Sequence, residues 1–179
     1  MKYYLLLLFT LTILGLNAQT FDAGIRIQKT SEMYWENGIS AKYSFKEFAP
    51  ERFYIGFDYI TSRLGSAFGS NAIKQDNYIL SGMWYFKDPK AFRCYGKVNA
   101  GYFYSDYEEA IFDEIPNTTF FASPELGFTY KNKNVPLYFN LGLGYSFGFA
   151  KTGYLPGTFQ PAYAHLDIQF PIFKSTSHE

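Results

Sequence analysis

The feature that most constrains the fold is an alternation of apolar and polar residues with a period of two. In residues 21–28, Phe21, Ala23, Ile25 and Ile27 alternate with Asp22, Gly24, Arg26 and Gln28. The same pattern recurs over residues 39–46, 53–59, 77–86, 92–102, 120–130, 137–147 and 164–172. Because successive side chains of a β-strand point to opposite faces, the pattern predicts eight strands, each with one apolar and one polar face.

The connections between these segments alternate in length. Short ones fall at 47–52, 87–91 and 131–135, and longer ones at 61–76, 105–118 and 148–161. This order favours antiparallel strands joined up and down, in a single all-β domain. Pro124 lies inside the sixth segment and cannot donate a ladder hydrogen bond, so we expect a bulge or a register shift there.

The apolar face is too bulky for the inside of a small barrel. It has about forty positions, many of them aromatic, in a chain with 17 Tyr and 20 Phe. The interior of an eight-stranded barrel is only wide enough for side chains or one small ligand, which argues against a lipocalin-like barrel. A two-sheet sandwich has more core room and remains the soluble alternative.

The position of residues along each strand favours a membrane. Aliphatic residues lie near strand centres and aromatic residues near both ends, as expected for side chains at two lipid–water interfaces. The aromatic residues near the short connections are Phe45, Phe53, Trp84, Phe86, Phe92, Tyr130, Phe139 and Phe170, and those near the long ones are Tyr59, Tyr78, Tyr102, Phe120, Tyr145 and Phe147. The sequence therefore predicts an eight-stranded antiparallel up-and-down transmembrane β-barrel.

This pattern, from Phe21 to Phe173, resembles the small eight-stranded outer-membrane barrels of bacteria, of the kind seen in OmpX and the membrane domain of OmpA. The resemblance implies location in the cell outer membrane, contact with its lipids, and long loops facing outside. It also implies recognition of the last strand by the assembly machinery, with Phe173 as the terminal aromatic residue. The chain departs from the usual form by continuing from Lys174 to Glu179.

The first residues have the features of an export signal. Lys2 precedes an apolar run from Tyr3 to Leu14, and Ala18 ends a cleavage site. A transmembrane anchor is the alternative, but the run is too short to cross about 30 Å of hydrocarbon as a helix. We therefore predict a signal peptide at residues 1–18 and the barrel domain at 19–179. The single cysteine, Cys94, excludes an internal disulfide.

Charged residues on the polar face are expected to meet inside the barrel. They are Arg26, Lys42, Arg93 and Lys97 with Asp22, Asp58, Glu125 and Asp167. Equal numbers of each sign in a narrow lumen favour paired charges that plug it. The alternative is a narrow, porin-like pathway for ions or small solutes.

The sequence offers little support for catalysis or for a cofactor. His165 and Asp167 share the polar face, but no nucleophile accompanies them in the pattern of a lipid-modifying enzyme. No metal-spaced His or Cys set, phosphate loop or basic groove occurs, and the 16 basic and 16 acidic residues balance, so nucleic acid is not an expected partner. Acidic residues between 106 and 114 and apolar residues between 154 and 161 are predicted to form exposed loops. We expect a non-enzymatic protein that supports envelope integrity or surface interactions through these loops, with no ligand assigned.

Overall fold

A computed structural model describes residues 18–31, 35–45, 48–49, 51–67, 70–86, 91–107, 116–132 and 134–174. Apart from Ala18, the predicted signal peptide lies outside these residues, as do positions 108–114 of the acidic loop. Nine strands occupy the described chain: β1 (Ala18–Thr30), β2 (Trp35–Phe45), β3 (Phe53–Ala67), β4 (Ser70–Tyr85), β5 (Phe92–Tyr107), β6 (Thr118–Lys131), β7 (Tyr138–Tyr145), β8 (Phe147–Phe149) and β9 (Ala162–Lys174).

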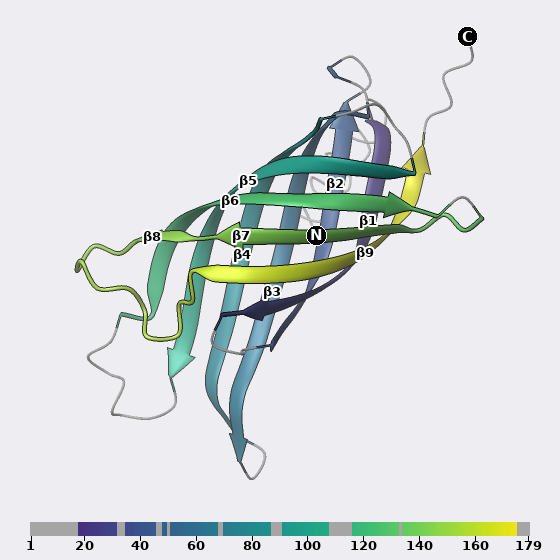
Figure 1. The fold of residues 1–179 in the computed structure, drawn as a ribbon. Coiled ribbons are helices and arrows are strands. Elements are labelled where there is room, and N and C mark those ends of the chain that lie inside the picture. The colour runs from purple at the N-terminus through teal and green to yellow at the C-terminus, as the bar shows by residue number, and fades with distance from the viewer. Residues whose placement is uncertain are drawn as a thin grey trace, which may run out of the picture.

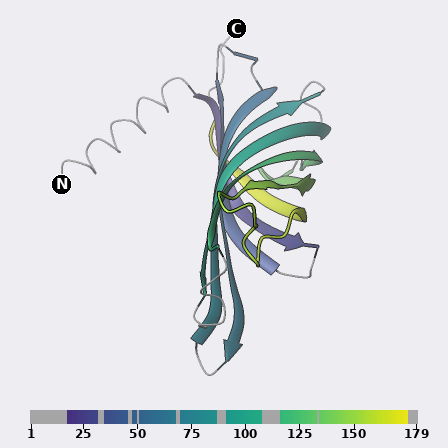
Figure 2. The same ribbon diagram turned by 90° about the vertical axis from the view of Figure 1, so that its left-hand side faces the viewer.

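These strands form one closed antiparallel barrel (Figures 1 and 2). Neighbouring strands pair in the order β5, β4, β3, β2, β1, β9, β7, β6, and pairing of β5 with β6 closes the ring. β8 continues β7 along the same neighbour, β6, so the nine strands fill eight positions around the barrel. The predicted eight-stranded up-and-down barrel is confirmed.

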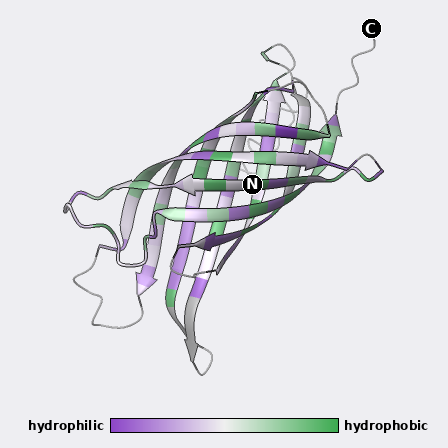
Figure 3. Ribbon diagram, viewed as in Figure 1, coloured by the Kyte–Doolittle hydropathy of each residue, from purple (hydrophilic) through white to green (hydrophobic). Residues whose placement is uncertain are grey.

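The polar face of every strand points inward. At mid-length of β5, Val98 is 66% exposed while its neighbours Lys97 and Asn99 are buried. Buried and more exposed positions alternate along most of β5 and β6. Hydrophilic and hydrophobic residues are interspersed along the strands (Figure 3). Most large apolar side chains therefore lie on the outside. The sandwich alternative is wrong, because the strands close into one barrel.

Pro124 interrupts the ladder without changing the register. The pairing of β5 with β6 runs without a shift from Phe92 opposite Tyr130 to Tyr104 opposite Thr118. The break falls on the other side, between β7 and β8, where Pro124 has no N–H to donate to the facing strand. The Ser146 N–H at this break donates to the carbonyl oxygen of Pro161, on the β9 side, at 2.7 Å. The expected bulge at Pro124 is therefore absent, while a register shift does occur beside Pro171, in β9.

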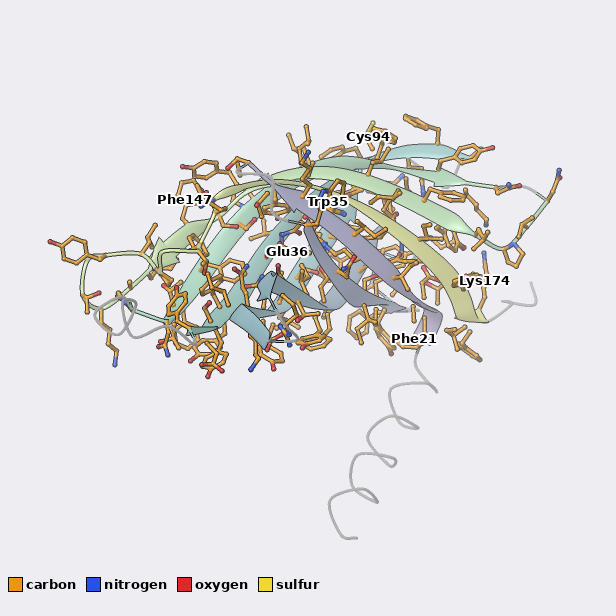
Figure 4. All side chains as sticks on the ribbon, turned by 90° about the horizontal axis from the view of Figure 1, so that it is seen from below. Phe21, Trp35, Glu36, Cys94, Phe147 and Lys174 are labelled. Carbon is orange, nitrogen blue, oxygen red and sulfur yellow. The ribbon has the colours of Figure 1, made fainter. Side chains whose placement is uncertain are left out.

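One end of the barrel, which we call the turn end, has the connections 46–52, 86–91 and 132–137 and both ends of the described chain. The opposite loop end has the connections 31–34, 68–69, 108–117 and 150–161. Figure 4 shows Lys174 at the turn end, Phe147 towards the loop end, and Cys94 projecting from the outer wall. No helix in the described ranges has the length and apolar character needed to span a bilayer.

The longest strands project beyond the barrel at the loop end. β3, β4 and β5 have 15 or 16 residues and extend beyond the segments predicted at 53–59, 77–86 and 92–102. Most of the predicted loop 61–76 is therefore a strand hairpin (Figure 1). On its outer surface the side chains of Tyr59, Thr61 and Arg63 donate to one carboxylate oxygen of Asp76, at 2.8, 2.7 and 3.1 Å. These contacts offset the low intrinsic stability of an exposed hairpin.

Candidate functional site

The centre of the lumen contains an ion-pair network around Arg26, which is 1% exposed. Its guanidinium lies 3.1 Å from Asp58, 3.7 Å from Glu125 and 3.8 Å from Asp167. The ammonium of Lys97 lies 2.7 Å from the same Asp58 oxygen. Five of the eight charged residues predicted to face the lumen therefore meet here, contributed by β1, β3, β5, β6 and β9. We call them, together with His165, the central cluster.

Glu125 accepts the largest number of hydrogen bonds in this cluster. Tyr95 and Tyr163 each donate a hydroxyl to it at 3.1 Å. The Nε2 atom of His165 lies 2.8 Å from Glu125, and its Nδ1 atom lies 3.2 Å from Asp167. A buried carboxylate is stable only when its lone pairs are satisfied, and the two tyrosines and the histidine meet that need.

Glycines in β6 and β7 provide the space for these large side chains. A methyl group added at Gly142 would collide with His165, and it would approach the Tyr95 hydroxyl to 2.7 Å. At Gly144 it would collide with the ring of Tyr163. The inward glycines of the sequence pattern are thus positions over which aromatic rings lie.

Lys42 lies nearer the turn end in a cage of aromatic rings. Its ammonium is 5.4 Å from the ring centre of Tyr54, 5.9 Å from that of Tyr85 and 5.2 Å from that of Tyr138. Asp22, on the neighbouring strand, is 3.6 Å away and is the carboxylate partner. Ring faces attract a desolvated cation, so Lys42 is held by one ion pair and three rings.

Arg93 does not join an ion pair within the described part of the chain. Its guanidinium stacks over the ring of Tyr85 at 3.9 Å and donates to the carbonyl oxygen of Glu51 at 2.9 Å. Of the eight predicted residues, Arg93 is therefore the one that the structure places with an aromatic ring and a backbone carbonyl, where pairing with a carboxylate was expected.

A buried carboxylate that the sequence analysis missed lies on the loop-end side of the central cluster. Glu36, in β2, accepts hydrogen bonds from the amides of Gln28 at 2.7 Å, of Asn77 at 3.5 Å, and of Gln75. Extending the alternation back from Lys42 through Ser40 would have placed Glu36 on the inward face. The predicted second segment begins at residue 39 and therefore does not include Glu36.

Part of the loop between β8 and β9 enters the loop end of the lumen. Phe159 from this loop is buried and packs on Phe103 and Phe121, with ring centres 5.3 and 5.8 Å apart. Thr158 donates to the hydroxyl of Ser105 at 3.3 Å. The predicted exposed loop 148–161 is thus partly buried: its Tyr154 is exposed, whereas Phe159 enters the barrel mouth.

The site holds its charges in place by ion pairs and hydrogen bonds. The side chain of His165 has no solvent exposure and sits between two carboxylates. Among the described residues, no group of three or more His, Cys, Asp or Glu side chains is placed to hold a metal ion. The arrangement therefore supports a packed lumen more than chemistry on a substrate.

Comparisons with known proteins identify the fold alone. No family model matches the chain, and no curated protein matches its sequence. The N-terminal β-barrel domain of Pseudomonas aeruginosa OprF is similar in structure, with a TM-score of 0.65 and 13% identity over 87% of this chain and 98% of that one. Neisserial surface protein A is also similar, with a TM-score of 0.52 and 14% identity over 84% and 92%. The chain thus has the fold of the small outer-membrane β-barrels.

Proposed function

We propose that this chain is a non-enzymatic outer-membrane protein whose lumen is closed and whose loop-end surface makes the functional contacts. The observation that supports this most is the central cluster, in which side chains from five strands meet across the lumen. Eight strands leave little space inside a barrel, and here that space contains paired charges and tyrosine rings.

Because the charges of the central cluster are buried, each of them depends on its partner for stability. Removing one partner of a buried ion pair typically costs about 3–5 kcal/mol, because the remaining charge is uncompensated. We expect substitution of Asp58 to destabilise the cluster most clearly, because Asp58 is the shared partner of Arg26 and Lys97.

Conductance of the refolded protein in planar bilayers tests the closed lumen. We expect the wild type to be silent, and Asp58→Ala to conduct or to unfold at a lower urea concentration. Asp76→Ala is the matched control, because it also removes a carboxylate paired with arginine but on the outer surface of the hairpin. Steady single-channel currents from the wild type would favour the alternative, a narrow pathway for ions or small solutes.

The non-enzymatic role is tested separately. His165 faces the lumen, so lipid cannot reach it through the wall. We expect the mass spectrum of lipid A to be the same in cells with and without the protein. A modified lipid A species that depends on the protein would contradict the proposal.

We also propose that the outer-membrane assembly machinery recognises β9 and that outer-membrane lipids surround the outer face of the barrel. Phe170, Ile172 and Phe173, in the last turn-end residues of β9, are exposed on the outside. Replacing Phe173 by Ser should lower the amount of protein recovered in the outer-membrane fraction. The matched control is Phe149→Ser, an exposed aromatic residue at the loop end, which should leave the amount unchanged.

A further inference from the structure

Glu36 is buried without a cation of its own. It is 1% exposed, and its hydrogen-bond partners are three neutral amides. Gln28 separates it from Arg26, because the Gln28 amide oxygen accepts from Arg26 at 2.8 Å while its nitrogen donates to Glu36. Within the described residues no ammonium or guanidinium lies within ion-pair distance of this carboxylate.

The charges of the central cluster do not leave a cation for Glu36. Arg26, Lys97 and His165 face Asp58, Glu125 and Asp167 there. Even if His165 is counted as a cation, three positive groups match three carboxylates. Lys42 and Arg93 lie towards the turn end, so they do not compensate Glu36 either. An isolated buried carboxylate is costly unless a cation or a proton neutralises it.

The atoms around Glu36 are of the kind that bind a cation. The buried oxygens Thr30 Oγ1, Gln75 Oε1 and Asn77 Oδ1 have no hydrogen-bond partner among the described residues. All three residues are at least nine-tenths buried and line one cavity together with Glu36. The amide nitrogens of Gln75 and Asn77 must face the carboxylate, which only accepts, so their oxygens are left as acceptors.

The cavity is small, with a volume of about 20 Å³. That is room for one water molecule or one ion of similar size. On its loop-end side it is lined by Phe103, Phe121 and Phe159. Hard oxygen ligands suit alkali and alkaline-earth cations, and a single carboxylate matches a single positive charge.

We propose that this cavity binds one monovalent cation, Na⁺, between Glu36 and the oxygens of Thr30, Gln75 and Asn77. The ion balances the negative charge of Glu36. It also provides a partner for the three oxygens that have no hydrogen bond. It makes the loop-end part of the lumen a cation site, separate from the ion pairs of the central cluster, and its existence does not depend on whether the barrel conducts.

Unfolding of the refolded barrel in zwitterionic detergent tests the site. The midpoint should be higher in sodium chloride than in tetramethylammonium chloride at equal ionic strength, because a ligand that binds only the folded state stabilises it. Glu36→Gln should abolish this difference, and in tetramethylammonium it should be at least as stable as the wild type. Glu51→Gln, which removes a carboxylate paired with Lys174 on the surface, is the control and should keep the difference.

A second variant and a second measurement cover the case in which Glu36→Gln does not fold. Thr30→Val removes one oxygen with little change of shape, and it should raise the sodium concentration needed for half of the effect severalfold. The ²³Na resonance should broaden with the wild type and less with Thr30→Val. Equal wild-type midpoints in the two salts would mean that water alone fills the cavity. A wild type that depends on pH but not on sodium would mean that Glu36 is protonated. Either result would overturn the proposal.

Discussion

Leu143→Arg is the change that best tests whether the outer face of the barrel meets hydrocarbon. Leu143 points outward from β7, is 67% exposed, and lies opposite Leu126 on one side and Ala164 on the other. Along its strand it lies between the aromatic positions Phe139 and Tyr145, so it is near mid-height of the apolar band.

The size of the effect depends on what surrounds this side chain. Arginine on the lipid face at the bilayer midplane costs about 2–4 kcal/mol, which is about 30-fold to 1,000-fold in the folding equilibrium. A leucine that is mostly exposed to water would change stability by only about 0.5 kcal/mol in either direction. The two environments therefore predict effects that do not overlap.

Urea unfolding in lipid vesicles, followed by tryptophan fluorescence, measures the difference. Val135→Arg is the matched control, since Val135 is an exposed apolar residue in the turn between β6 and β7, outside the apolar band, where the cost should be about 0–1 kcal/mol. If both arginine variants unfold at the same urea concentration, the outer face does not lie in hydrocarbon and the membrane interpretation fails.

Three further predictions concern closure, packing and the loop-end cap. The folded protein should migrate differently on SDS gels before and after boiling, because a closed barrel has no edge from which to unzip; identical mobility of a sample known to be folded would speak against closure. Gly142→Ala should lower the free energy of unfolding by about 1–3 kcal/mol through overpacking, whereas Gly82→Ala, where the nearest atom to the added methyl group is 3.7 Å away, should be tolerated; equal stability of the two variants would contradict the packing described. Phe159→Ala should release the β8–β9 loop and speed tryptic cleavage after Lys151, while Tyr154→Ala, at an exposed position, should not; unchanged cleavage of Phe159→Ala would show that the ring does not hold the loop.

The orientation of the strands could be predicted from the sequence because it depends only on a local period of two and on volume. Lys97 and Val98 are neighbours in the chain, yet one is buried in the lumen and the other is exposed on the wall, as the alternation predicts. The central cluster followed from the same reasoning, because inward charges from facing strands have only one narrow space to share.

The features that could not be predicted from the sequence depend on contacts between distant parts of the chain. The alternation says that Arg93 points inward, but not that its partner is the ring of Tyr85. Nothing local in residues 148–161 distinguishes Phe159, which enters the barrel mouth, from Tyr154, which does not. The projecting hairpin was missed for a different reason: its polar residues are common in loops, and its strand pairing is visible only in three dimensions.

On one side of the projecting hairpin, β3 loses its neighbouring strand after Thr61. The pairing of β2 with β3 stops where Asn37 faces Thr61, whereas β3 continues with β4 as far as Ala67 facing Ser70. Residues 62–67 of β3 therefore have a β-sheet neighbour on one side only, among the described strands. We therefore expect that a strand supplied by another chain would extend the sheet at this edge without displacing a pairing between β2 and β3.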